Sequence, residues 1–405
     1  MLSSADSRSV ARMTTHLVAA AGVILGGLAA LATAGAGLPV AVDASAACGA
    51  LTAATADDCL RLNHLQLLGT HNSYHLAPEA PVLRLLGDKA PALDYSHRPL
   101  VEQLDRLGIR TLEIDVYADP EGGRYAAPAA LRLGGDLARI TPPPPVLRTP
   151  GFKVIHVPDF DFQSTCPTLV ACLTEVRDWS RAHPRHVPLM VMIELKDGPR
   201  DDPRGVGLVQ PLPIDRAAMA ALDAEIRRVF DEDHLLTPDD VRGDARSLRE
   251  AIAGRGWPTL RASRGKVLFA MDNTDAHRDE YLAGHASLEG RVLFVSADPG
   301  TPAAAFLKLN DPLGAEGERI RAVVRDGYIV RTRADEPGVE ARTGDTRRRD
   351  AAFLSGAQFV STDYPEPSPF GTGYVARLPG ATGIVARCNP VSAPAGCRDA
   401  WLEPR

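Results

Sequence analysis

The sequence alternates short apolar runs, each about as long as a β-strand, with stretches whose apolar residues recur at helical spacing. Eight runs fit strands: Leu62–Gly69, Ile109–Tyr117, Lys153–Val157, Leu189–Leu195, Lys266–Met271, Val292–Val295, Tyr328–Arg333 and Gln358–Thr362. Helical patterns lie between several of them, at Pro99–Leu107, Leu169–Ala182, Ala217–Phe230, Gly317–Arg325 and Thr346–Leu354. This order predicts an α/β fold, a (β/α)8 TIM-like barrel, with a doubly wound open sheet as the alternative.

The 405 residues predict a single folded domain with two irregular segments. Ala118–Gly151 contains paired glycines and a run of four prolines, so we expect a long excursion on the barrel rim. We predict the barrel at residues 47–363, followed by a Pro/Gly-rich tail at 364–405 that packs on it and carries a disulfide. No glycine-rich turn of the dinucleotide-binding or P-loop kind follows a predicted strand.

Residues 1–46 have the order of a secretory signal peptide. Arg8 and Arg12 precede an uncharged apolar stretch, residues 17–42, and Ala44-Ser45-Ala46 offers a cleavage site. The stretch is long for a signal, so a retained anchor helix is the alternative. The glycines within it favour cleavage, and we expect a secreted, extracellular protein.

The six cysteines fall into three close pairs, Cys48/Cys59, Cys166/Cys172 and Cys388/Cys397. Six cysteines permit many pairings, which sequence alone does not decide. Short loops favour bonding between neighbours, and export would place the chain in an oxidising compartment. A metal cluster is the alternative, but no CxxC or Cys-His spacing supports it.

The charge balance bears on possible partners. The chain has 45 Lys+Arg against 51 Asp+Glu, a formal net charge of −6. A nucleic-acid-binding protein would need a basic face to neutralise phosphates, so we expect no nucleic-acid partner. Nothing in the sequence implies a protein partner either, and we expect a monomer.

Polar side chains gather where the predicted strands end, which is where barrel enzymes carry their active sites. On the second strand, Glu113 and Asp115 are two residues apart and therefore point to one face. Two carboxylates facing a barrel interior repel each other unless a positive charge lies between them. The first four predicted strands contribute His71, Asn72, Glu113, Asp115, His156, Glu194 and Lys196.

These residue types suit a metal-assisted reaction on a phosphate. Carboxylate and amide oxygens are hard ligands that fit Ca²⁺ better than Zn²⁺. Histidines can transfer protons and stabilise charge beside them. Structural alternatives exist for each member: His156 as a buried strand histidine, Glu113 with Asp115 as an edge-strand pair, and Glu194–Lys196 as an ion pair. Because all these residues occur at the ends of four consecutive predicted strands, a functional site is favoured over these structural alternatives. The other histidines, His75 and His97 among them, receive no role.

The set resembles the phosphatidylinositol-specific phospholipase C family, in particular its calcium-dependent branch. That family has a His-Asn pair after the first barrel strand, E-x-D on the second, His after the third and Glu ending the fourth. The corresponding residues are His71-Asn72, Glu113-Ile114-Asp115, His156 and Glu194. The resemblance covers residues 61–196 well and the remainder through the barrel pattern. Secreted actinobacterial enzymes of this type look most similar.

The resemblance implies an enzyme that cleaves phosphatidylinositol at a membrane surface to diacylglycerol and a cyclic inositol phosphate. Asn72, Glu113, Asp115 and Glu194 would bind one Ca²⁺, which would lower the pKa of the inositol 2-hydroxyl. Glu113 would take the proton of that hydroxyl, and His71 would stabilise the transition-state charge. His156 would protonate the departing diacylglycerol oxygen.

Four residues lie near predicted strand ends and are the candidates for binding the headgroup: Lys196, Arg331, Arg333 and Asp363. Eukaryotic members of the family bring lysines from the fifth strand to headgroup phosphates. Here the strand Lys266–Met271 ends without a basic residue, so the resemblance implies unphosphorylated phosphatidylinositol as the substrate.

Two other functions remain open. A glycerophosphodiester phosphodiesterase shares the barrel and the metal, but usually opens with His-Arg-Gly where this chain has His71-Asn72-Ser73. A secreted barrel protein that binds without turnover would require a broken set of residues, whereas here every expected position is filled. The reaction product distinguishes the two enzymes: a phospholipase C of this family releases a cyclic inositol phosphate, and the phosphodiesterase releases glycerol phosphate.

Overall fold

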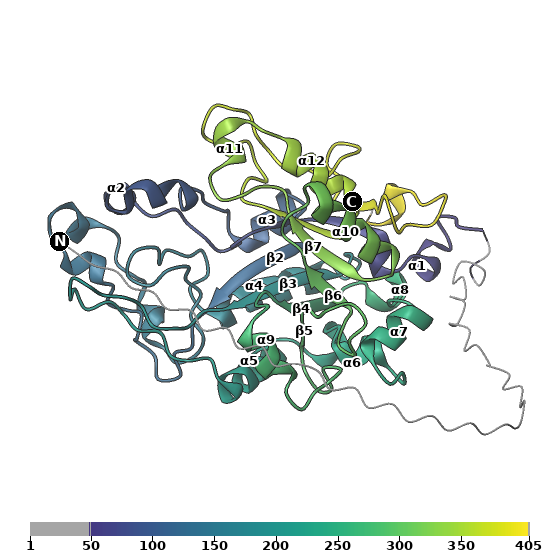
Figure 1. The fold of residues 1–405 in the computed structure, drawn as a ribbon, viewed down its shortest axis with the longest axis horizontal. Coiled ribbons are helices and arrows are strands. Elements are labelled where there is room, and N and C mark those ends of the chain that lie inside the picture. The colour runs from purple at the N-terminus through teal and green to yellow at the C-terminus, as the bar shows by residue number, and fades with distance from the viewer. Residues whose placement is uncertain (1–47, 49, 404–405) are drawn as a thin grey trace, which may run out of the picture. The chain divides into compact units, whose positions relative to one another are not determined.

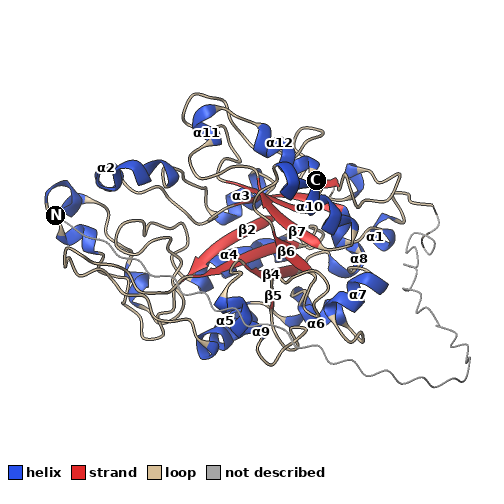
Figure 2. Cartoon of the chain, in the orientation of Figure 1, coloured by secondary structure: helices blue, strands red, loops and turns tan. Residues whose placement is uncertain are grey.

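The structure is a computed structural model that describes Cys48 and residues 50–403. Strands occupy its centre and helices surround them (Figure 2). The strands are β1 (Leu65–Thr70), β2 (Thr111–Val116), β3 (Leu189–Leu195), β4 (Val267–Met271), β5 (Leu293–Phe294), β6 (Phe306–Lys308), β7 (Ile329–Arg333), β8 (Phe359–Thr362) and β9 (Ala386–Cys388).

The first eight strands form a nearly closed barrel. They run in the order β5-β4-β3-β2-β1-β8-β7-β6, and every neighbouring pair in this order is parallel. A single parallel bridge between Ser296 and Phe306 joins the two ends of this order. The prediction of a (β/α)8 TIM-like barrel is therefore confirmed over the doubly wound open sheet.

One predicted strand is wrong and another was missed. Lys153–Val157 makes only isolated bridges and contributes no barrel strand. Its buried Lys153 ammonium instead donates to the carbonyls of Thr149 and Gly151 and lies 3.1 Å from Asp119 Oδ2. The barrel strand that sequence analysis missed is β6, which is only three residues long and follows a run of alanines. A segment this short has no clear periodicity.

The helices cover the barrel from outside (Figure 1). All five predicted helices form, the clearest being Leu169–Ala182, whose Thr168 hydroxyl caps the first turn. The helices are α1 (Ala56–Cys59), α2 (Ala80–Leu86), α3 (Leu100–Arg106), α4 (Leu169–Ala182), α5 (Arg216–Val229), α6 (Pro238–Arg242), α7 (Leu248–Gly254), α8 (Leu260–Ser263), α9 (Ala276–Leu282), α10 (Gly314–Arg325), α11 (Glu340–Thr343) and α12 (Arg347–Leu354).

The connections after β1 and β2 are long and pack together at one end of the barrel (Figure 1). The β2–β3 connection contains short 3-10 helices at Ala129–Arg132, Gly135–Arg139 and Pro145–Arg148. A second apolar cluster lies beneath these connections and joins Val82 of α2 to Tyr125, Ile140 and Phe162. Because both connections leave the carboxyl ends of their strands, this end is where an active site is expected.

Pairing between strands decides which side chains share a face. Asp115 of β2 pairs with Glu194 of β3, so both carboxylates point the same way. Gly69 of β1 pairs with Thr111, and a Cβ added at Gly69 would lie 2.6 Å from the Thr111 Cβ. Glycine therefore permits a close approach of β1 and β2 next to the predicted site.

The three predicted disulfides, Cys48–Cys59, Cys166–Cys172 and Cys388–Cys397, are confirmed. In the C-terminal segment, β9 pairs antiparallel with the start of β1, from Leu65↔Cys388 to Leu67↔Ala386. The predicted signal peptide, residues 1–46, lies outside the described residues. Within the described part of the chain, no helix has the length and apolar character needed to cross a membrane.

Candidate active site

The barrel mouth carries a ring of charged side chains at the carboxyl ends of the strands. Asp115 and Glu194 pair across β2 and β3, and Asp272 directly follows β4. Lys308 ends β6 and pairs with Arg331 of β7. The ring is completed by His71, Arg333 and Asp363 at the ends of β1, β7 and β8. Only the closed barrel brings residues so distant in sequence to one opening.

The turn after β1 is locked to β2. The Ser73 N–H donates to the Glu113 carbonyl at 2.8 Å, and the Glu113 N–H donates to Ser73 Oγ at 2.9 Å. Asn72, directly before Ser73 in this turn, has a φ of 44°, a left-handed conformation that asparagine tolerates better than most residues. These bonds fix His71 and Asn72 beside the carboxylates of β2.

Glu113, Asp115 and Glu194 form a compact acidic cluster, each offering an oxygen within 4.8 Å of the others. Both carboxylate oxygens of Asp115 and the Oδ1 of Asn72 are buried and accept no hydrogen bond from the described residues. Buried oxygens without partners are costly, which a cation among them would offset. The donor set of carboxylates and one amide oxygen fits Ca²⁺.

Two cations of the chain flank this cluster. The Lys196 ammonium lies 3.1 Å from Glu194 Oε1 and 3.3 Å from Asp115 Oδ2. The fully buried Arg331 forms an ion pair with Glu113 and also bonds Asn310. Burial nevertheless raises the pKa of Glu113 and of Asp115 to about 8, with neighbouring carboxylates adding to the rise. The two cations therefore do not fully compensate the acids.

His71 is held by a buried carboxylate. Its Nδ1 lies 2.8 Å from Asp363 Oδ1, and Asp363 Oδ2 accepts from Arg333 at 3.0 Å. Although burial opposes it, the hydrogen bond from His71 and the charge of Arg333 hold the pKa of Asp363 below its usual range. Burial, reinforced by Arg333, lowers the pKa of His71. A neutral His71 donates from Nδ1 to Asp363 and keeps Nε2 unprotonated, 3.7 Å from Glu113 Oε1.

The predicted strand before His156 does not form. His156 therefore lies on the β2–β3 connection rather than after a barrel strand. Its Nδ1 bonds Asp161 Oδ2 at 2.6 Å. Asp161 also bonds His75, whose ring lies 5.5 Å from that of His156 and stacks on Tyr95 at 4.4 Å. The Tyr95 hydroxyl accepts from Asn72 Nδ2 at 3.1 Å, so a chain of contacts through Asp161, His75 and Tyr95 connects His156 to Asn72.

The residues predicted to bind substrate all lie at the barrel mouth, but they differ in how far other side chains of the protein already engage them. Lys196 remains partly exposed beside Asp115 and Glu194. Arg331 is engaged by Glu113 and Asn310. Both oxygens of Asp363 are used by His71 and Arg333, which favours a role in orienting His71 over contact with a headgroup.

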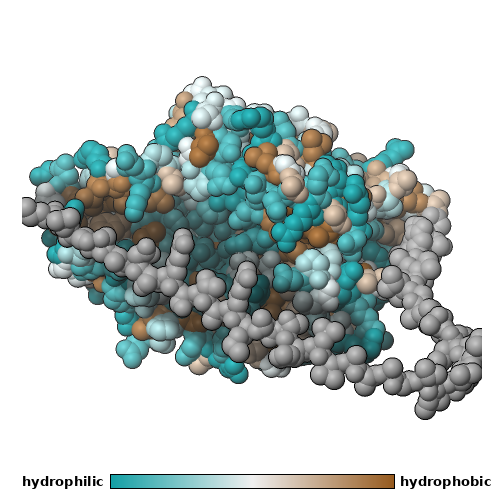
Figure 3. Space-filling view, viewed as in Figure 1, coloured by the Kyte–Doolittle hydropathy of each residue, from teal (hydrophilic) through white to brown (hydrophobic). Residues whose placement is uncertain are grey.

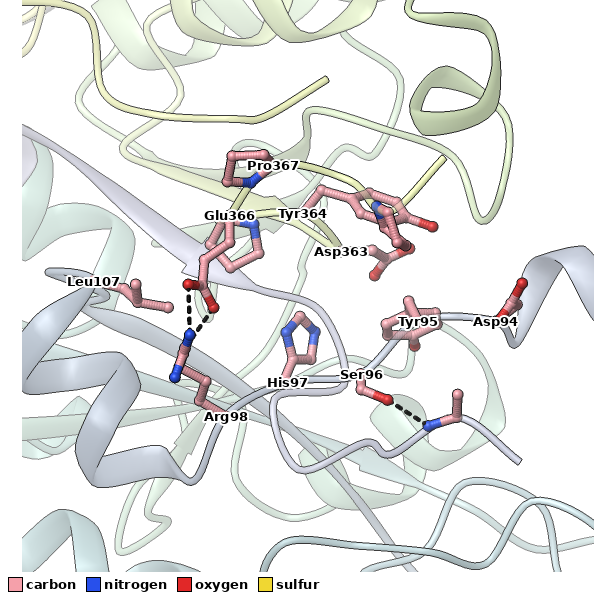
Figure 4. Close-up of a pocket in the computed structure, with 13 residues that line it drawn as sticks. Asp94, Tyr95, Ser96, His97, Arg98, Leu107, Asp363, Tyr364, Glu366 and Pro367 are labelled. Atoms are coloured by element: carbon pink, nitrogen blue, oxygen red, sulfur yellow. Dashed lines mark hydrogen bonds and ion pairs between the residues drawn. The ribbon is translucent and has the colours of Figure 1, made fainter. Parts of the chain in front are cut away.

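Several further residues that shape the site were not identified from the sequence. His97 Nε2 donates to the His71 carbonyl at 2.8 Å, and burial lowers the pKa of His97 to about 4, which keeps it neutral. Figure 4 shows His97 between the Arg98–Glu366 ion pair and Tyr95, and these residues line a pocket together with Asp363. Asp161 was missed because it belongs to no motif and its partners come together only in the folded chain. Arg333 was predicted as a headgroup contact and instead donates to Asp363. His75, four residues after His71, was a visible but unused signal.

The strand Lys266–Met271 does have a basic neighbour at its end. The missed strand β6 brings Lys308 there, with its ammonium 2.6 Å from Asp272 Oδ2. Asp272 is largely buried and neutralises this lysine. The cation at this position is thus already paired with a carboxylate of the chain.

Residues 60–390 match the family described as "Phosphoinositide phospholipase C, Ca2+-dependent". The search of curated proteins finds no match.

Bacterial proteins are among the solved structures that this chain resembles. A calcium-dependent phosphoinositol-specific phospholipase C from Pseudomonas sp in its apo form is 17% identical, with a TM-score of 0.51 over 82% of this chain and 96% of that chain. The myo-inositol complex from the same genus is 17% identical, with a TM-score of 0.50 over 84% and 98%. A Ca²⁺-dependent phosphatidylinositol-specific phospholipase C from Streptomyces antibioticus is 20% identical, with a TM-score of 0.49 over 79% and 100%. At such identities the Pseudomonas structures support the fold alone.

Proposed function

The chain belongs to the Ca²⁺-dependent phosphoinositide phospholipase C family of phosphodiesterases, and on that premise we propose that it cleaves phosphatidylinositol to diacylglycerol and a cyclic inositol phosphate. The observation that carries the proposal is the arrangement at the barrel mouth. A cluster of Glu113, Asp115 and Glu194 lies beside a histidine with a free Nε2, and a second histidine stands on the β2–β3 connection.

Four residues would hold the cation: Asn72, Glu113, Asp115 and Glu194. The unpartnered oxygens of Asn72 and Asp115 and the close approach of the three carboxylates favour this assignment. A bound Ca²⁺ supplies positive charge that lowers the pKa of a neighbouring hydroxyl and offsets the charge of the phosphate. Lys196, already between Asp115 and Glu194, would contact the phosphate or the inositol hydroxyls once those carboxylates are engaged.

His71 is the group we assign to proton abstraction. The family resemblance implied Glu113 for this role, but Arg331 engages that carboxylate, which is also one of the proposed ligands. The Asp363 carboxylate orients His71 through Nδ1, so Nε2 can accept the proton of the inositol 2-hydroxyl. The hydroxyl oxygen then bonds to phosphorus, and the bond from phosphorus to the diacylglycerol oxygen breaks.

His156 supplies the proton that the departing diacylglycerol oxygen needs. An alkoxide is a poor leaving group, so its protonation in the transition state accelerates the step by a factor of roughly 10²–10⁴. Arg331 and Arg333 contribute buried positive charge to the mouth, where negative charge develops on the phosphate oxygens.

The lipid surface would meet the elements that follow β1 and β2. They carry exposed apolar side chains: Leu85 on α2, and Leu133 and Val146 on the β2–β3 connection. Figure 3 shows apolar surface beside α2 on the face drawn. We assign these residues to the membrane contact because they lie at the end of the barrel that holds the site.

Secretion forms part of the proposal. The three disulfides fit an oxidising compartment, and the N-terminal sequence has the order of a signal peptide.

The test is cleavage of phosphatidylinositol vesicles by purified protein, followed by phosphorus NMR with Ca²⁺ and with excess chelator. We expect a cyclic inositol phosphate only with Ca²⁺. Cyclic product that persists in chelator would remove the metal from the proposal. Hydrolysis of glycerophosphodiesters without any inositol product would replace the function with the alternative phosphodiesterase activity.

A further inference from the structure

His156 has no barrel strand to fix it, and a proton donor must be held in place to act. The structure therefore has to supply another support for its ring. The candidate is Asp161, a fully buried carboxylate that no sequence motif singled out.

Asp161 is shared by two histidines. Oδ2 lies 2.6 Å from His156 Nδ1, while Oδ1 and Oδ2 lie 2.9 and 3.0 Å from His75 Nε2. His75 is itself fixed, because its Nδ1 lies 3.0 Å from the Tyr95 carbonyl and its ring stacks on Tyr95. A carbonyl only accepts, so His75 carries a proton on Nδ1. Its Nε2 lies within hydrogen-bond distance of both Asp161 oxygens, so the ring spans the Tyr95 carbonyl and the Asp161 carboxylate.

These contacts are hydrogen bonds rather than the edges of a metal site. The same three residues do form a cluster of possible ligands. Ligands about 2.0 Å from a tetrahedral metal would, however, lie roughly 3.3 Å apart. The observed separations of 2.6 and 2.9 Å are hydrogen-bond distances. Although burial opposes it, the charge of His75 and the bond from His156 lower the pKa of Asp161, consistent with an ionised acceptor.

The backbone that carries Asp161 is equally constrained. Val157 and Asp161 exchange two backbone hydrogen bonds of 2.9 Å, which closes a tight loop directly after His156. Asp159, at the tip with a φ of 77°, pairs with Arg200 and accepts from the N–H groups of Ala129 and Val209. The loop is thereby attached to an earlier part of its own β2–β3 connection and to the connection that follows β3.

We propose that Asp161 is the positioning residue of the leaving-group acid: it accepts from His156 Nδ1 and is itself clamped by His75, so that the proton on His156 Nε2 is presented to the reaction. This inference rests on the proposed function. In the step, the phosphorus–oxygen bond to the leaving group breaks, the proton of His156 Nε2 moves to that oxygen, and His156 becomes neutral while keeping its Nδ1 bond to Asp161.

Leaving-group dependence tests the proposal. The purified enzyme, with Ca²⁺, is given phosphatidylinositol and a 4-nitrophenyl ester of inositol phosphate. The nitrophenolate leaves without protonation, so a defect in the acid affects the lipid reaction only. For Asp161→Asn and Asp161→Ala we expect kcat on phosphatidylinositol to fall by roughly 10²–10³, and kcat on the aryl ester by less than about fivefold. KM should change little on either substrate.

His75→Gln weakens the support of Asp161 while leaving the His156 side chain unchanged. We expect a smaller fall in kcat on phosphatidylinositol than for the Asp161 variants, again with little effect on the aryl ester. Asp223→Asn is the matched control, because Asp223 is a buried carboxylate bonded to Tyr281 and Arg291 outside the site. Its effect, if any, should be equal on both substrates. The midpoint of thermal unfolding of each variant, measured in parallel, shows whether the fold is retained.

Three results would overturn the proposal: equal losses on both substrates for folded Asp161 variants, no loss on phosphatidylinositol, or a stoichiometric metal ion bound by His75, His156 and Asp161. If Asp161→Ala fails to fold, His75→Gln and Asp161→Asn decide the question. Failure of the unmodified protein to cleave either inositol ester would instead reject the proposed function, before any variant is compared.

Discussion

His71 and Asp363 are separated by 292 residues, yet His71 Nδ1 and Asp363 Oδ1 lie 2.8 Å apart at the barrel mouth. The contact exists because β1 and β8 are neighbours, paired from Leu67↔Phe359 to Thr70↔Thr362. Each residue directly follows its strand, so the pairing of the strands continues into the pair of side chains. Closure of the barrel therefore creates the dyad.

Asp363→Asn should remove most of the activity without unfolding the protein. An amide can donate to His71 Nδ1 and stabilise the wrong tautomer, with the proton on Nε2. We expect kcat on phosphatidylinositol to fall by roughly 10²–10⁴. Steady-state kinetics on vesicles measures the fall, and the Ca²⁺-induced increase in Tm should remain. Activity close to that of the unmodified enzyme would remove Asp363 from the mechanism.

Asp115→Asn should weaken calcium binding. Both Asp115 oxygens are buried and accept no hydrogen bond within the described chain. The Lys196 ammonium, 3.3 Å from Oδ2, also pairs with Glu194, so removing the Asp115 charge deletes a ligand and leaves this lysine a carboxylate partner. We expect the Ca²⁺ concentration for half-maximal activity to rise by a factor of about 10 or more. The matched variant His156→Ala should lose turnover and keep the Ca²⁺-induced stabilisation. An unchanged calcium titration for Asp115→Asn would contradict its assignment as a ligand.

Charged substitutions at the proposed membrane contact should separate binding to vesicles from chemistry. Leu85→Glu and Leu133→Glu place charge on exposed positions that need no burial in the free protein. Vesicle binding and lipid cleavage should fall several-fold, while the soluble aryl ester is cleaved normally. Leu354→Glu is the control: Leu354 is exposed at the end of α12, which leads into the amino end of β8. An equal response of all three variants would argue against the assignment.

Stability should decrease on acidification because buried histidines resist protonation. His186 donates from Nδ1 to the Val187 carbonyl and accepts from Ser180 Oγ, a neutral form, and burial lowers its pKa to about 4. Below pH 6.5 the unfolded chain binds a proton at this histidine, whereas the folded chain does not until about pH 4. The free energy of unfolding therefore decreases as the pH is lowered.

At pH 5 this effect costs about 2 kcal/mol relative to neutral pH for His186. Urea unfolding at pH 7.5 and pH 5, with disulfides intact, measures it. His186→Gln should reduce the difference between the two pH values by about that amount. A variant with an unchanged pH dependence would show that His186 is not the responsible group.

Periodicity predicted most of the fold. Five helices and seven of the eight barrel strands follow from the alternation of apolar and polar residues. The two errors, Lys153–Val157 and β6, concern short segments whose pairing depends on the rest of the chain. Lys153–Val157 has strand-like composition, but its lysine finds carbonyls and Asp119 in a loop. Local composition does not contain that information.

By itself, the sequence determined the arrangement of groups that are close in the chain: Glu113 and Asp115 on one face of β2, His71 next to Asn72, and the neighbouring cysteine pairs. The tertiary structure decided which remote side chains hold the two histidines of the site in place. Asp363 and Arg333 reach His71 only through closure of the barrel, and Asp161 reaches His156 through a loop held by His75. Spacing along a strand is fixed by backbone geometry, whereas contacts between strands and loops depend on how the whole chain packs.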